Sequence, residues 1–136
     1  MNRRLARETV FKLLFEQTFH ADRGADEIYD TARIAQEWED DAYVKEVFFG
    51  ACARLPELDA LIEKHSHGWK KSRISAVSLS LLRLAVYEML FREDIPYQVS
   101  INEALELVKT YDDEQARSFV NGILHAVATE LGKTQA

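Results

Sequence analysis

The residues best suited to chemistry are basic and aromatic side chains near the N-terminus. Arg4, Arg7, Phe11 and Phe15 are spaced by three or four residues, so on one helix they form a stripe that begins cationic and ends aromatic. Guanidinium groups bind phosphates and stack on bases, and aromatic rings accept unstacked bases. The stripe therefore indicates a surface for single-stranded RNA. The alternative, which composition alone favours, is that both rings are core residues and the arginines only solvate a helix start.

The distribution of charge matters more than its sum. The chain has 17 lysines and arginines against 23 aspartates and glutamates, a formal charge of −6, which disfavours binding to phosphates. Basic residues are nevertheless concentrated in the first basic segment (residues 1–12) and the second basic segment (residues 64–73), where Trp69 lies among cations. The alternative for the second segment is a solvated loop with Trp69 in the core. An RNA surface is favoured if the fold brings both segments to one face.

The sequence offers little for catalysis or cofactor binding. A single cysteine, Cys52, excludes an internal disulfide framework and a cysteine-based zinc cluster, and its surroundings predict a small core residue. His65 and His67 lie among cations that would repel a metal, so we predict a surface loop there. The glycines are scattered singly and form no phosphate-binding loop. We therefore expect no enzyme activity, no metal and no cofactor.

The same features predict a cytoplasmic protein. One cysteine suits a reducing compartment, and the N-terminus lacks the apolar run and cleavage site of a signal peptide. The longest apolar stretch, residues 76–91, is interrupted by Arg83 and Glu88 and is too short and too charged to span a bilayer. We therefore expect no membrane contact.

Helical periodicity dominates the chain. It predicts about seven helices, and Pro56 separates two of them because proline disrupts a helix interior but suits a first turn. We expect an all-α protein with a single domain over residues 1–136, made of two small helical bundles over about residues 1–65 and 66–136. The expected helices cover about residues 4–18, 25–38, 41–54, 56–64, 76–91, 100–111 and 114–131.

Two local signals lead to more specific expectations. Ser100 and Glu103 match the capping-box pattern, which predicts that a helix starts at Ser100. Gly122 follows Asn121 inside a helical pattern, where glycine costs roughly 1 kcal/mol relative to alanine. We therefore expect another backbone or a ligand to come close to Gly122, with helix packing as the first explanation.

Arg83 lies inside the most apolar predicted helix, where a buried guanidinium needs an acidic partner. Glu88 and Glu103 are the acids that could supply it. We therefore predict a structural role for Arg83.

Four blocks of sequence resemble the NusB family of bacterial transcription antitermination factors. They are RRLARE (3–8), LRLAVYE (82–88), PYQVSINEALELVK (96–109) and FVNGIL (119–124), in the family's order. The resemblance covers nearly the whole chain. It implies an all-α fold of two small helical bundles, in agreement with the periodicity.

The resemblance also implies a function and partners. NusB pairs with NusE, a small-subunit ribosomal protein, and the pair binds the boxA element of nascent ribosomal RNA transcripts. This seeds the antitermination complex with which RNA polymerase reads through terminators. By similarity, the RNA-binding residues expected here are Arg3, Arg4, Arg7, Lys70, Arg73, Tyr111, Arg117 and Phe119.

The surface expected to bind NusE departs from the family pattern. Phe15 replaces a more usual tyrosine, and Ser78 and Gln115 stand where acids are common, which would weaken or retune the NusE contact. A different interpretation of the acidic surface is a protein-only helical adapter that recruits a basic ribosomal protein. A homodimer that hides the RNA face is a further alternative that the sequence leaves open.

Overall fold

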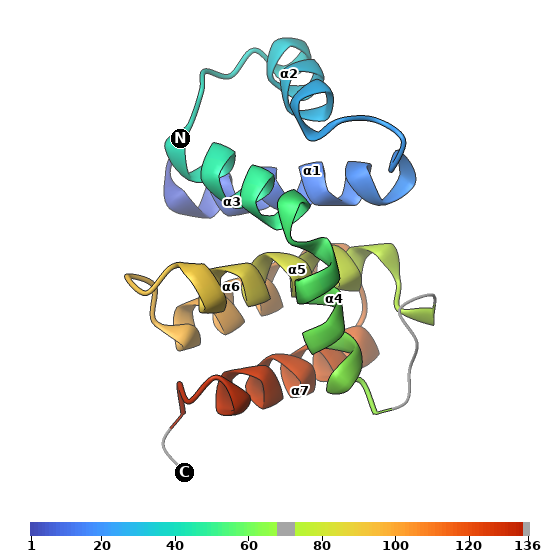
Figure 1. Cartoon of the computed structure of the whole chain (residues 1–136), viewed down its shortest axis with the longest axis vertical. Helices are drawn as coiled ribbons and strands as arrows, with labels where there is room; N and C mark the ends of the chain where they lie inside the picture. Colours follow the sequence, from blue (N-terminus) through green and yellow to red (C-terminus); the bar gives the residue numbers. More distant parts are fainter. Residues whose placement is uncertain (68–72, 135–136) are drawn as a thin grey trace.

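The computed structural model describes residues 1–67 and 73–134, and these form seven helices and no strand. The all-α prediction is therefore confirmed. None of the described helices has the length and apolarity to cross a membrane. The helices, shown in Figure 1, are α1 (Arg3–Phe19), α2 (Ala25–Gln36), α3 (Ala42–Ala53), α4 (Leu55–Lys64), α5 (Ala76–Phe91), α6 (Tyr97–Tyr111) and α7 (Glu114–Glu130).

Short polar side chains begin four of these helices. Asn2 accepts a hydrogen bond from a backbone amide in the first turn of α1. Asp41, Ser75 and Asp113 cap α3, α5 and α7 in the same way. Such a cap satisfies an amide that has no partner within its helix. Between α3 and α4, Pro56 lies in the first turn of the new helix, as predicted.

The start of α6 differs from the prediction. The helix begins at Tyr97, with Pro96 as its N-cap, so Ser100 lies one turn inside it. The Ser100 hydroxyl donates to Glu88 Oε1 at 2.7 Å, and Glu103 binds Arg4. The capping box is therefore wrong, because both side chains that would form it have partners on other helices.

Helix α5 is the centre of the molecule. It contacts α1, α3, α4, α6 and α7, and its residues from Ser78 to Met89 are buried. In Figure 1 it lies between α1 and α3 on one side and α7 on the other. Helix α4 packs on α5 and α7 as well as on α3. The division of the chain into bundles at about residue 65 stays a prediction.

The close approach expected at Gly122 occurs instead at Gly50. A Cβ atom at Gly122 would have no neighbouring atom within 4 Å, so packing within the described chain does not explain that glycine. A Cβ atom at Gly50, on α3, would lie 2.6 Å from Cζ of Tyr87 on α5. Gly50 therefore lets the ring of Tyr87 lie directly against the backbone of α3.

Candidate nucleic-acid interface

The three arginines at the start of α1 have three different environments. Arg3 is exposed, and its guanidinium carbon lies 4.4 Å from the centre of the Tyr43 ring. Arg4 is also exposed, with 76% of its side chain accessible, although Glu103 binds it. Only 7% of the Arg7 side chain is accessible. Two of the three predicted phosphate ligands are thus on the surface and the third is inside.

Arg7 is buried because its guanidinium pairs with a carboxylate in the core. Its Nε donates to Glu88 Oε2 at 2.9 Å, and Tyr43 donates its hydroxyl to the same oxygen. Ser100 donates to the other oxygen at 2.7 Å. The hub around Glu88 therefore joins α1, α3 and α6 to α5. This burial argues against Arg7 as a direct RNA contact and for a role in orienting the start of α1.

Burial and charge within this hub shift the pKa of the Tyr43 phenol. Burial raises the pKa of its phenol, and the negative charge of Glu88 adds to the effect. The guanidinium of Arg92, on the chain after α5, lies 5.6 Å from the Tyr43 ring and binds Asp94 at 2.9 Å. Sequence reasoning missed both Tyr43 and Arg92, because only tertiary packing brings them to the arginines of α1.

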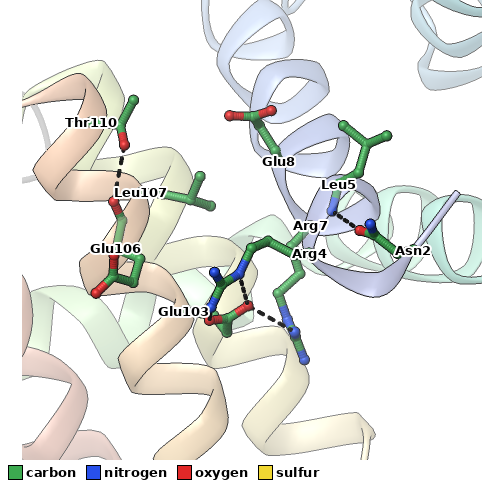
Figure 2. Close-up of a pocket in the computed structure, with 9 residues that line it drawn as sticks. All are labelled: Asn2, Arg4, Leu5, Arg7, Glu8, Glu103, Glu106, Leu107 and Thr110. Carbon is green, nitrogen blue, oxygen red and sulfur yellow. Dashed lines mark hydrogen bonds and ion pairs between the residues drawn. The ribbon is translucent and has the colours of Figure 1, made fainter.

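A pocket of about 450 Å³ separates α1 from α6 beside these arginines (Figure 2). Arg4 Nη2 lies 2.9 Å from Glu103 Oε2, and Arg4 Nε lies 3.2 Å from Oε1, so the pair is two-pronged. Glu8 and Glu106 also line the pocket. The first basic segment therefore lies next to carboxylates rather than in an uninterrupted positive surface.

Tyr111, at the end of α6, lies against the middle of α1. Its hydroxyl donates to Glu8 Oε2 at 2.9 Å, which raises the pKa of the phenol. Its ring centre is 5.0 Å from that of Phe11, and 38% of the residue remains exposed. Tyr111 thus presents a fixed and accessible aromatic surface, the arrangement on which an unstacked base can rest.

The aromatic end of the α1 stripe is only partly on the surface. Phe11 is buried and Phe15 is half-buried, so the core alternative is right for Phe11. The ring of Phe15 lies 5.1 Å from that of Phe19, which is 61% exposed. Phe19 was missed by sequence reasoning, although it continues the same spacing of four residues.

The second basic segment is described only in part. Lys70 lies outside the described residues, as do Trp69 and Lys71. Arg73 is exposed and helps to line a pocket of about 440 Å³ between the starts of α5 and α7. Predicted RNA and NusE residues share this pocket, because it is also lined by Phe119, Ser78 and Gln115.

Three predicted residues near this pocket differ in accessibility. Ser78 is buried, and its hydroxyl donates to Asp112 at 3.4 Å. Gln115 and Arg117 are exposed in the first turn of α7. Gln115 and Arg117 are therefore accessible to a partner, whereas the side chain of Ser78 is covered by its neighbours.

The arginines at the start of α1 and the described residues that follow the second basic segment lie near different ends of α1. Thr18, at the end of α1, lines a groove with Ile74 and Ala76 at the start of α5, whereas the first basic segment is at the beginning of α1. A helix of 17 residues is about 25 Å long. Arg4 and Ile74 are therefore near opposite ends of α1, and the ring of Tyr111 packs on Phe11 between them.

Arg83 has a different partner from the one predicted. Its Nε and Nη2 atoms each lie 2.8 Å from an oxygen of Asp59 on α4. Both residues are buried, so this ion pair joins α4 to α5 in the core. The structural role of Arg83 is confirmed, but Glu88 and Glu103 serve the arginines of α1 instead.

Within residues 1–67 and 73–134, no group of three or more His, Cys, Asp or Glu side chains is arranged to hold a metal ion. His65 instead lies 2.9 Å from Glu130 on α7. Cys52 is half-buried, and burial raises the pKa of its thiol to about 11. A thiol with so high a pKa is a poor nucleophile at neutral pH.

The fold and its charged clusters are those of a small all-α protein whose arginine-rich helix start is anchored on a buried glutamate of the central helix. The model of the NusB family matches residues 4–129, and the chain belongs to that family. The resemblance seen in the four sequence blocks is thereby confirmed.

Relatives and solved structures agree with this assignment. The transcription antitermination protein NusB of Natranaerobius thermophilus is 42% identical over 139 residues, covering 99% of this chain and 100% of that protein. The structure of T. maritima NusB is 37% identical, with a TM-score of 0.83, covering 96% of this chain and 92% of that one. A structure of antitermination factors NusB and NusE in complex with double-stranded RNA contains a chain that is 28% identical, with a TM-score of 0.84 and coverage of 94% and 96%.

Proposed function

We propose that the chain is a cytoplasmic, non-enzymatic RNA-binding transcription antitermination factor. With NusE it binds the boxA RNA of nascent ribosomal transcripts and promotes antitermination by RNA polymerase. The observation that carries this proposal is the similarity over 94% of the chain to a protein in a structure of NusB and NusE with RNA. The exposed arginines at the start of α1 supply the matching chemistry on this chain.

The RNA backbone binds at Arg3 and Arg4, the exposed arginines of the first basic segment. Guanidinium groups pair with phosphates and fix the register of the strand. An unpaired base stacks on Tyr111, whose ring Phe11 and Glu8 hold in place. Further contacts come from the second basic segment and from α7, through Lys70, Arg73, Arg117 and Phe119.

NusE binds at the pocket between the starts of α5 and α7, which is lined by residues predicted to contact NusE and by residues predicted to contact RNA. Gln115 is exposed in the same pocket as Arg73, so a protein bound there would also lie against the RNA. Phe15 adds an apolar contact on α1, and Ser78 supports the pocket from inside. The net charge of −6 favours a basic partner such as a ribosomal protein.

The test compares the wild-type chain with the double variant R3A/R4A. Binding of a fluorescein-labelled boxA single strand is measured by anisotropy, with and without NusE, over a range of salt concentrations. We expect the double variant to bind about tenfold more weakly, with a salt slope shallower by about 1.4, because each neutralised phosphate of a single strand contributes about 0.7 to the slope. Binding of NusE should be unchanged.

R33A, which removes one positive charge on α2, is the control and should leave boxA binding unaltered. Equal boxA affinity for the wild type and R3A/R4A would exclude the RNA role of the first basic segment. Binding of NusE without any binding of boxA at low salt would identify the chain as the protein-only adapter.

A further inference from the structure

The phosphate-binding fork of Arg4 is already occupied within the chain. Both prongs of its guanidinium face the carboxylate of Glu103, at 2.9 and 3.2 Å, as Figure 2 shows. A carboxylate and a phosphate offer a guanidinium the same two-oxygen geometry. An RNA phosphate that approaches Arg4 must therefore compete with Glu103 for the same donors.

The ion pair between Arg4 and Glu103 is weak enough to be broken by a competing anion. The Arg4 side chain is 76% exposed, and exposed ion pairs are weak because water and salt screen them. Glu103 is only 16% exposed and has a second partner, since Arg7 Nη1 lies 3.6 Å from its Oε1. When Arg4 turns away, Glu103 keeps Arg7 as a neighbour and is not left as an isolated charge.

We propose that Glu103 sets the affinity of this chain for RNA by competing with the RNA backbone for Arg4. The inference rests on the proposed function, because it assumes that RNA binds at Arg4. Phosphate contacts carry no sequence information, so Glu103 weakens the binding of every single strand to a similar extent. High affinity then requires the further contacts that boxA bases or NusE provide.

The test uses E103Q, which keeps the shape of the side chain and removes its charge. We expect E103Q without NusE to bind a labelled boxA strand about three- to tenfold more tightly than the wild type, because the competing anion is gone. A scrambled strand of the same length should bind more tightly by a similar factor. E106Q is the matched control, since Glu106 lies one turn further along α6 in the same pocket and forms no ion pair with Arg4 among those described. It should change affinity less than twofold.

The double variant R4A/E103Q separates competition for Arg4 from a general effect of charge. We expect it to bind like R4A, because without Arg4 there is nothing to compete for. The proposal is overturned if E103Q binds RNA no more tightly than E106Q, or if its tighter binding persists when Arg4 is absent. If neither the wild type nor E103Q binds RNA even with NusE, the proposed function itself fails.

A measurement on the wild type covers the case in which E103Q is misfolded. The side-chain Nε–H signals of Arg4 and Arg7 are followed by NMR while the boxA strand is added. We expect the Arg4 signal to move as its partner changes and the Arg7 signal to stay in place. An Arg4 signal that does not move at saturation would contradict the exchange of partners.

Discussion

Glu88 is a charged residue at a position that water does not reach, with only 1% of its side chain exposed. A buried carboxylate is stable only when it is paired and its oxygens are hydrogen-bonded. Arg7, Tyr43 and Ser100 meet this requirement from three different helices. The charge of Glu88 therefore fixes the position of the first basic segment relative to the rest of the molecule.

Replacement of Glu88 tests this role. E88Q removes the charge and leaves the Arg7 guanidinium buried beside Glu103 alone, at 3.6 Å. We expect the free energy of unfolding to fall by about 3–5 kcal/mol, the usual cost of breaking a buried pair. Urea unfolding followed by circular dichroism measures it.

E57Q is the control for this experiment. Glu57 pairs only with Arg54 among the described residues, and both side chains are about half exposed, so the decrease should stay below about 1 kcal/mol. If E88Q costs no more than E57Q, Glu88 does not anchor α1.

Helices α3 and α5 contact each other at Gly50 and Tyr87. The missing side chain of Gly50 makes room for the ring of Tyr87, which is buried against α3. Burial and a hydrogen bond to Glu46 raise the pKa of the Tyr87 phenol to about 12. Gly122, by contrast, leaves open space beside α7. Two glycines within helices thus have opposite consequences for packing.

The two glycines predict stability changes of opposite sign. G50A places a methyl group against the ring of Tyr87, and we expect the free energy of unfolding to fall by about 1–3 kcal/mol. G122A adds a methyl group in open space and reduces the freedom of the unfolded chain, so we expect a rise of about 0.5–1 kcal/mol. Thermal and urea unfolding of both variants, side by side, measure the difference. A destabilised G122A would mean that Gly122 has a conformational or packing role that its open surroundings do not reveal.

For the molecule as a whole, the central consequence of the fold is that basic residues predicted to bind RNA lie near different ends of α1. Arg3 and Arg4 lie at the start of this helix, whereas Ile74, next in sequence to Arg73, lines a groove with Thr18 near its end. Tyr111 lies between them. An RNA strand that reaches both ends must therefore run along the molecule rather than bind at a single positive patch.

This separation predicts independent contributions to RNA binding. Arg4 and Arg73 line different pockets, and substitutions at distant sites without shared partners usually add. We expect the decrease in binding free energy for R4A/R73A to equal the sum of the decreases for the single variants within about 0.5 kcal/mol. Anisotropy titrations of the boxA strand with NusE present give the three values. A larger deviation from additivity would show that Arg4 and Arg73 contribute to a single RNA-binding site.

Sequence reasoning predicted the helices well because their signals are local. The helical periodicity of the apolar residues and the break at Pro56 depend on neighbours within about one turn of helix. The concentration of arginine at the start of α1 was equally visible. The all-α fold could therefore be predicted before any tertiary contact was known, whereas the residues assigned to the RNA surface stay predictions.

Only the tertiary structure decided what each charged or polar side chain does. Arg4 and Arg7 are one turn apart and alike in sequence, yet one is on the surface and the other is bound to Glu88. Ser100 donates a hydrogen bond to Glu88 instead of capping a helix, and Arg83 pairs with Asp59 instead of the acids predicted for it. The reason is physical. Periodicity shows which face of a helix is apolar, but the partner of a buried charge depends on the distance and register between helices that are far apart in the sequence.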